Sequence, residues 1–140
     1  MKPTSFFIRF IETPKARVGL RPDRIVETDV FEGQELNIED VKEIIAAIGV
    51  LVEGEMMPQL IVAGPLSGPD LPAMRFLAIK DSSPFAIAEA YVITSLSQKI
   101  IARFYLNFNK PGRPTKTFSD ESEALLWLKE QVQLFNAIKK

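Results

Sequence analysis

The chain has no cysteine and no histidine among its 140 residues. Their absence excludes disulfides, a thiol nucleophile, an iron–sulfur cluster, a zinc site built on these ligands and every His-based catalytic arrangement. Proton transfer would fall to Asp, Glu, Lys or Tyr, and metal binding to carboxylates and carbonyls. The sequence shows no organised set of such groups, so we expect a non-enzymatic protein without catalytic residues, cofactor or metal.

A strong net charge and a long apolar run are also missing. The formal net charge of -1 gives no long-range field that would attract a polyanion, which argues against a nucleic-acid partner. No segment approaches the roughly 20 apolar residues of a membrane span, and Arg9 interrupts the N-terminal apolar run, which argues against a signal peptide. We therefore expect a cytoplasmic protein with no membrane span.

The composition that is present suits one folded unit. Hydrophobic residues make up 46% of the chain and charged residues 25%, and the length is close to the commonest size of a single domain. Such a chain can bury one core without disulfides or metals. We expect a single domain over residues 1–140.

The first half of the chain predicts a β-hairpin or meander, then a helix and a buried strand. The predicted short strands span residues 6–11, 16–20 and 25–31. In the third of them Glu27 and Asp29 alternate with apolar residues, which predicts that one face of this strand is exposed to water. Asn37 suits the N-cap of a long helix. The continuous apolar run Leu60-Ile61-Val62-Ala63 is typical of a central parallel strand that is buried on both faces.

The second half predicts further alternation of helices and strands. The expected elements are a short helix over 73–80, a strand over 88–94, a helix over about 95–107, a strand over 115–118 and a last helix. Pro114 confines the strand that follows it to a sheet edge, and Ser119 or Asp120 caps the last helix. The order of elements predicts an α/β fold with a mixed sheet and about four helices.

Particular residues in these elements match a known pattern. They are Arg75-Phe76, Ser95, Lys99-Ile100, Phe104 through Pro111, Pro114, Thr117-Phe118, Glu123-Ala124-Leu125 and Trp127-Leu128. With them, the chain from about Leu36 to Leu128 resembles the bacterial SpoIIAA-like proteins, which are related to STAS domains and to the CRAL-TRIO lipid-transfer fold. The resemblance implies a SpoIIAA-like, STAS-type mixed sheet and a regulatory module that docks to partner proteins.

The loop after the predicted central strand is the first candidate site, because ligands and modifications collect at this edge of open α/β sheets. Its candidate residues are Gly64, Ser67, Gly68 and Asp70. The resemblance implies that some related domains are switched by phosphorylation of a serine in a motif Asp-x-Ser-x-x-x-Ser-x-Gly after this strand. Here only Ser67 is present, while the Asp and the second serine of the motif are absent. Phosphorylation of Ser67 is thus a hypothesis from position alone.

The last helix offers a candidate interface. Trp127, Leu134 and Ile138 form an apolar stripe that is offset from the residues expected to pack inward. An exposed apolar stripe usually marks a contact with another protein. We expect a homodimer, with docking to a different, unidentified protein partner as the competing use of this surface.

A second function stays open beside the regulatory module. Phe76, Tyr91, Phe104 and Phe108 crowd the middle of the chain and, in a fold related to lipid-transfer domains, are candidates to line a cleft for a small apolar ligand. Ordinary core packing also explains them. The alternative function is therefore a carrier or sensor of a small apolar molecule.

The charged clusters have simpler explanations than a site. Arg103, Lys110, Arg113 and Lys116 form a possible anion-binding patch, but such residues also complement a helix dipole and protect an edge strand from pairing. The acids at the start of the last helix are expected on dipole grounds. We assign neither cluster a ligand.

Overall fold

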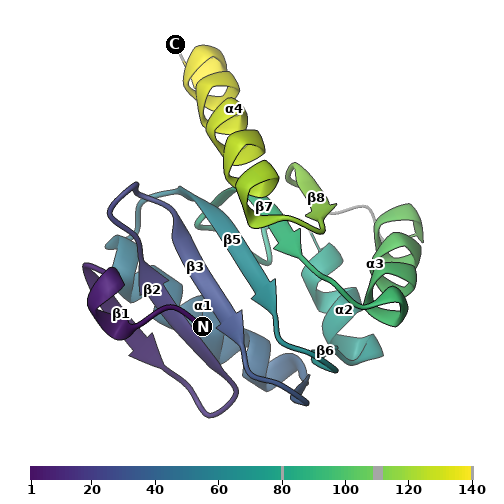
Figure 1. Cartoon of the computed structure of the whole chain (residues 1–140). Coiled ribbons are helices and arrows are strands. Elements are labelled where there is room, and N and C mark those ends of the chain that lie inside the picture. Colours follow the sequence, from purple (N-terminus) through teal and green to yellow (C-terminus); the bar gives the residue numbers. More distant parts are fainter. Residues whose placement is uncertain (80, 109–111, 140) are drawn as a thin grey trace.

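The computed structural model describes residues 1–79, 81–108 and 112–139, with the side chains of all of these except residues 104, 105, 107, 108 and 139. A mixed sheet in the order β1-β2-β3-β5-β7-β8 forms the centre of the molecule (Figure 1). Its strands are β1 (Arg9–Glu12), β2 (Ala16–Leu20), β3 (Val26–Val30), β5 (Met57–Ala63), β7 (Ala86–Val92) and β8 (Thr115–Phe118). β1, β2 and β3 pair antiparallel, whereas β3, β5, β7 and β8 pair parallel. The predicted meander, central parallel strand and edge strand are confirmed.

Helices cover both faces of this sheet. They are α1 (Ile38–Val52), α2 (Leu71–Ala78), α3 (Leu96–Phe108) and α4 (Glu121–Lys139), with a short 3-10 helix, η1 (Thr4–Phe6), near the N-terminus. α1 and α2 lie behind the sheet in Figure 1, while α4 lies in front and its C-terminal half extends past the strands. No helix within the described residues is long and apolar enough to span a membrane. The expected α/β fold with a mixed sheet and four helices is confirmed, and the expectation of one domain over residues 1–140 stays a prediction.

The start of α1 follows from its sequence. The Asn37 side chain accepts a hydrogen bond from the Asp40 backbone, and the Asp40 carboxylate accepts one from the Asn37 backbone, which together form a capping box. The helix ends at Glu53, whose φ of 53° is left-handed, followed by Gly54 at 79°. The apolar stripe of α1 then packs on β2 and β3 and builds the larger of two cores.

The second core lies under α4. Ala88 and Ala90 of β7 and Ala124 of α4 are completely buried, so the helix backbone comes close to the strand. Leu128 is completely buried in the same core, and the centroids of the Phe118 and Trp127 rings are 5.7 Å apart. Small residues on the strand therefore determine where the last helix lies.

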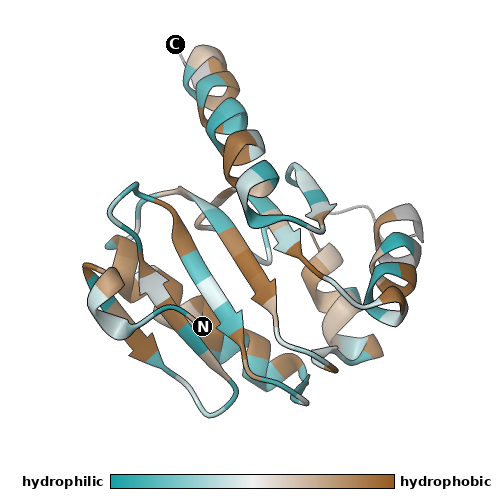
Figure 2. Ribbon diagram, viewed as in Figure 1, coloured by the Kyte–Doolittle hydropathy of each residue, from teal (hydrophilic) through white to brown (hydrophobic). Residues whose placement is uncertain are grey.

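The expectation of a water-exposed face on β3 is wrong. Figure 2 shows hydrophilic colours along the middle of this strand, yet Glu27 is 1% exposed and Asp29 5% exposed. The N-terminal segment folds over them, and the strand that was predicted from Phe6 begins only at Arg9 because residues 4–6 form η1. The alternation of charged and apolar residues identified the polar face of the strand correctly. It carried no information about the distant segment that covers this face.

Candidate functional site: a cavity between the sheet and three helices

A cavity of about 190 Å³ lies between the sheet and α1, α2 and α3. Its helix-side walls are apolar and include Val41, Ile44, Ile45 and Ile48 of α1, Met74 and Leu77 of α2, and Ile101, Ala102 and Leu106 of α3. Phe85, the residue that precedes β7 in the sequence, contributes an aromatic side chain to the lining. The cavity thus has the apolar lining that is usual for small-molecule sites.

The floor of the cavity is more polar than its walls. It carries Thr28 of β3, Gln59 of β5, Glu89 and Tyr91 of β7, and Thr117 of β8. The strand register places Gln59 directly beside Glu89, and Ile61 between Thr28 and Tyr91. Neighbouring strands are about 4.8 Å apart, so these polar side chains occupy two adjacent rows of the sheet.

Gln59 is held by its amide nitrogen. Its Nε2 donates to the backbone oxygens of Met57 and Phe85, both at 3.3 Å. Because carbonyls only accept, this contact determines which end of the amide is nitrogen. The Gln59 Oε1 atom is buried and has no hydrogen-bond partner among the described residues.

Glu89 forms a buried ion pair with Arg113. The Arg113 guanidinium donates to the Glu89 carboxylate and also to the Leu77 backbone oxygen at 3.1 Å. Burial raises the pKa of Glu89, against the charge and hydrogen bond of Arg113 and a hydrogen bond from Tyr91. Arg113 is therefore engaged inside the protein and is not available to a surface anion patch, the alternative to which the sequence assigned no ligand. Lys110 of that cluster lies outside the described residues.

The predicted regulatory loop closes one end of the cavity. Ser67 and Gly68 belong to its lining, and Gly68 pairs with the turn before α1 in a two-stranded sheet of β4 (Glu35–Leu36) and β6 (Gly68–Pro69). Gly64 lies against β3, where an added Cβ would be 2.4 Å from the Val30 oxygen. Asp70 caps α2 by accepting from the Ala73 backbone.

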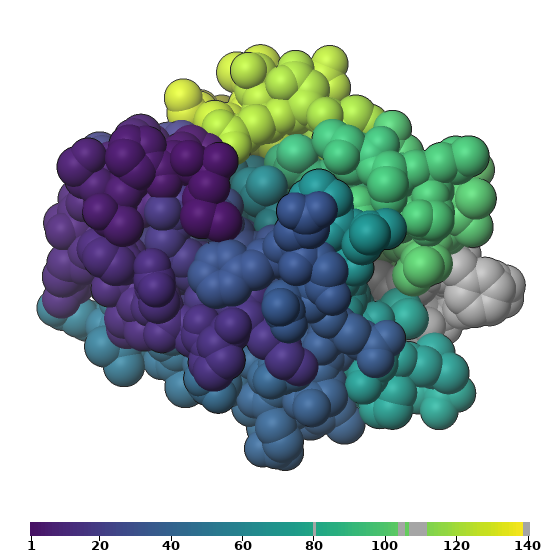
Figure 3. All heavy atoms as spheres, turned by 60° about the horizontal axis from the view of Figure 1, so that its bottom comes forward, coloured from purple at the N-terminus to yellow at the C-terminus, as the bar shows by residue number. Residues whose placement is uncertain are grey.

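Ser67 itself is buried in this loop. Its Oγ donates to the Gly64 oxygen at 2.7 Å, and Gln98 of α3 donates to the oxygens of both Gly64 and Ser67. In Figure 3 the blue turn before α1, the teal loop before α2 and the green start of α3 lie side by side. A kinase could reach the Ser67 hydroxyl only after this loop had opened.

The aromatic residues expected around an apolar ligand are divided by the structure. Tyr91 lines the cavity, whereas Phe76 packs on the core beside α1, under the Lys42 amine. The side chains of Phe104 and Phe108 lie outside the described part of the chain. Sequence reasoning missed Gln59 and Glu89, although each is a single polar residue in an otherwise apolar strand, a pattern that indicates a buried polar group.

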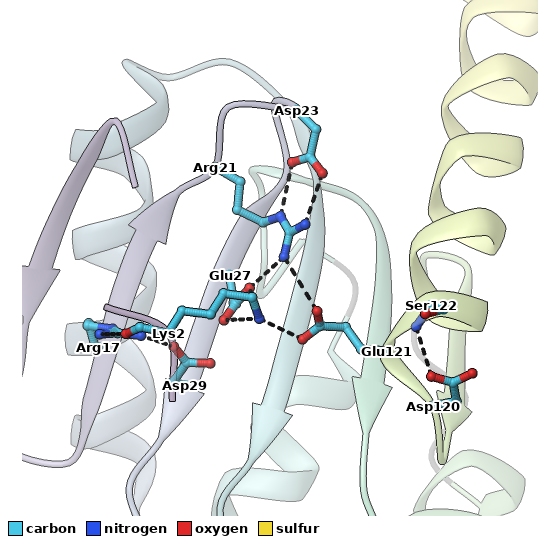
Figure 4. Close-up of polar contacts among 9 residues, drawn as sticks. All are labelled: Lys2, Arg17, Arg21, Asp23, Glu27, Asp29, Asp120, Glu121 and Ser122. Carbon is cyan, nitrogen blue, oxygen red and sulfur yellow. Dashed lines mark hydrogen bonds and ion pairs between the residues drawn. The ribbon is translucent and has the colours of Figure 1, made fainter. Parts of the chain in front are cut away.

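A second polar cluster lies on the opposite face of the sheet, under the N-terminal segment (Figure 4). Arg21 of the β2–β3 turn pairs with Glu27 at 2.7 Å and with Asp23 at 3.0 Å. The Lys2 amine bridges Glu27 and Glu121 of α4. These pairs connect the N-terminus, the sheet and the last helix, so the cluster has a structural role.

Asp29 is the least compensated carboxyl of this cluster. It has one cationic partner, Arg17 at 2.9 Å, whereas Glu27 has Arg21 and Lys2. Burial and the neighbouring Glu27 carboxylate raise the pKa of Asp29 to about 7. Burial alone would raise the pKa of Glu27 too, but hydrogen bonds with Asp29, Arg21 and Lys2 and the Lys2 charge lower it. The electrostatics therefore favour protonation of Asp29 over protonation of Glu27, and the two carboxyls titrate as a pair.

The candidate interface residues of α4 fall into two groups. Trp127 is half-buried against Phe118, while Leu134 is 56% exposed and Ile138 is 85% exposed. Leu134 and Ile138 belong to the C-terminal half of α4 (Glu121–Lys139), and this half of the helix extends past the sheet (Figure 1). The structure separates Trp127, a packing residue, from an apolar surface near the end of the helix.

The sheet order and the helices on both of its faces place this protein among those with a SpoIIAA-like fold. An uncharacterised protein of the DUF3478 family from Shewanella loihica PV-4, which has a SpoIIAA-like fold, superposes with a TM-score of 0.52 at 15% identity, covering 86% of this chain and 90% of its own. The family model of a domain of unknown function, DUF7793, matches residues 19–132. The chain belongs to that family. No curated protein matches the chain.

Proposed function

We propose that this protein is a non-enzymatic module that binds a small apolar molecule in the cavity between the sheet and α1, α2 and α3. The single observation that carries the proposal is the cavity itself, with a volume of about 190 Å³ and three apolar helix walls. An engineered apolar cavity of about 150 Å³ is known to bind benzene. A molecule somewhat larger than benzene therefore fits.

The remaining lining residues support binding over catalysis. Glu89, the carboxylate on the cavity floor, is paired with Arg113, and the Ser67 hydroxyl is engaged by the Gly64 oxygen. Neither is positioned beside a base that would activate it. The geometry favours the carrier or sensor that the sequence offered as its alternative. We keep the cytoplasmic location expected from the sequence as part of this proposal.

The proposal is tested by filling the cavity with a larger side chain on α3. Ala102 lines it, so Ala102→Leu should place added methyl groups inside, whereas Ala46→Leu, on the exposed side of α1, should leave it open. We expect p-xylene to bind the wild type and Ala46→Leu, with shifts of amide NMR signals from cavity-lining residues, and to bind Ala102→Leu at least tenfold more weakly. Equal binding by both variants, or no binding to the wild type, would contradict the proposal.

A second candidate function is a homodimeric interaction module. The observation that favours it is the exposure of Leu134 and Ile138 where α4 extends past the sheet. A second copy could bury both residues by pairing helix against helix. Sedimentation equilibrium should then show a dimer for the wild type and a monomer for Ile138→Glu. A wild-type monomer at high concentration would rule this use of α4 out.

A further inference from the structure

We infer that the ligand of this cavity carries a hydroxyl group on its apolar body, and that Thr28 and Gln59 on the cavity floor hold this hydroxyl. The inference rests on the proposed function and names the chemical class of the ligand for the same site. It is drawn from two polar side chains of the cavity lining, the buried Gln59 oxygen without a partner and the Thr28 hydroxyl, to which the described part of the protein gives no hydrogen bond.

Thr28 is the first of them. It lies in the middle of β3, is 3% exposed, and belongs to the cavity lining. No hydrogen bond joins its hydroxyl to any other residue in the described part of the chain. Its oxygen is not one of the fully enclosed side-chain atoms that lack a partner, so a molecule in the cavity can reach it.

Gln59 is the second. It is 3% exposed and lines the cavity, and its amide nitrogen donates hydrogen bonds to the backbone oxygens of Met57 and Phe85. Its Oε1 has no partner among the described residues, and an oxygen of this kind accepts but does not donate. The ligand group that satisfies it must be a donor.

The sheet brings these two residues together. Gln59 is paired with Val26 and Thr28 with Ile61, so Thr28 and Gln59 are diagonal neighbours on the cavity face of adjacent strands. One hydroxyl can donate to the Gln59 oxygen and accept from the Thr28 hydroxyl. The opposite walls of α1 offer only apolar contacts to the remainder of the ligand.

The carboxylate of the lining, its second amide side chain and the Ser67 hydroxyl are satisfied within the protein. Glu89 is paired with Arg113, the Ser67 hydroxyl donates to the Gly64 oxygen, and the Gln98 amide donates to two backbone oxygens. Polar groups inside a protein normally have hydrogen-bond partners, and positions where this rule fails are often functional. Thr28 and Gln59 are such positions in this cavity.

The experiment compares two probes of nearly equal shape, p-cresol with a hydroxyl and p-xylene with a methyl group in its place. By calorimetry, the wild type should bind p-cresol on the order of tenfold more tightly, since each net hydrogen bond contributes a few-fold to affinity. Thr28→Val and Gln59→Leu should each reduce this preference and retain p-xylene binding. Thr94→Val, at an exposed position away from the cavity, is the matched control and should keep the preference.

A second readout separates a ligand contact from a structural role. Because the Thr28 hydroxyl has no protein partner, Thr28→Val without ligand should melt at a higher temperature than the wild type. Equal affinity of the wild type for both probes would overturn the inference and leave the proposed function standing. A preference that survives in both variants would overturn the assignment to Thr28 and Gln59, and failure of both probes to bind would overturn the proposed function and this inference together.

Discussion

At the scale of single residues, the chain buries charge where the sequence suggested exposure. Arg17, Arg21, Glu27 and Asp29 are all at most 5% exposed, on one face of β2 and β3. Buried charges persist in proteins only when they are paired, and these residues are paired across the strands or with the N-terminal segment. Asp29 has the fewest partners and is thus the residue at which pH should act.

The stability of the protein should fall as pH rises from about 5 to about 7, above the range in which Glu27 and Asp40, whose pKa values are lowered, act in the opposite direction. The pKa of Asp29 is about 7 in the folded chain, against an ordinary value of 3.8 for an aspartate in the unfolded chain, so the folded state binds its proton more tightly. The stabilisation from that proton is fully present below pH 3.8 and is lost by about pH 7, with a slope that approaches about 1.4 kcal/mol per pH unit. Glu89, whose pKa is also raised, acts in the same direction.

Urea denaturation at several pH values checks this prediction. The chain has no histidine, so no imidazole contributes between pH 5 and 7. Asp29→Asn should reduce the slope and leave the part that comes from Glu89, while Asp81→Asn, at an exposed position, should keep the wild-type slope. A wild-type slope in Asp29→Asn would show that Asp29 is ionised throughout this range.

At the scale of elements, the described residues of α4 that are completely buried lie in its first half. Ala124 and Leu128 are completely buried against β7 and β5, whereas Leu126 and Leu134 are exposed. The sequence of α4 predicted a helix, because helical spacing is a local signal. It placed Trp127 on the outward stripe, whereas Trp127 packs against Phe118 of the edge strand, a contact that α4 alone could not predict.

Leu128→Ala should destabilise the protein by about 2–5 kcal/mol, because it leaves a cavity in the second core between helix and sheet. Leu134→Ala makes the same chemical change in the same helix at an exposed position and should change stability by less than about 0.5 kcal/mol. Thermal or urea unfolding of the two variants measures the difference. Similar losses in both would mean that the second half of α4 is also packed against the protein.

At the scale of the whole molecule, the sheet separates two cores of different composition, one on each of its faces. The face under α4 and the N-terminal segment combines a small alanine-rich core with the buried ion pairs. The face under α1, α2 and α3 combines the larger apolar core with the cavity. The proposed ligand site is therefore on the opposite side of the sheet from the Arg17–Asp29 and Arg21–Glu27 pairs, whereas the Glu89–Arg113 pair lies on the cavity side.

Much of the fold could be predicted from the sequence because its signals are local. The cap at Asn37, the apolar run of β5 and the proline before β8 each specify an element within a few residues. The short pairing of β4 with β6 was missed, since each strand has only two residues and depends on contact between segments far apart in the chain.

By itself, the sequence determined the order of the longer strands and helices, the cap at Asn37, and the absence of thiol and imidazole chemistry. Only the tertiary structure decided that Glu27 and Asp29 are buried, that Arg113 reaches Glu89, and that a cavity forms above Thr28 and Gln59. The physical reason is the distance along the chain over which each property is decided. Helix and strand signals depend on residues only a few positions apart, whereas the burial of a polar group depends on which distant segments cover it.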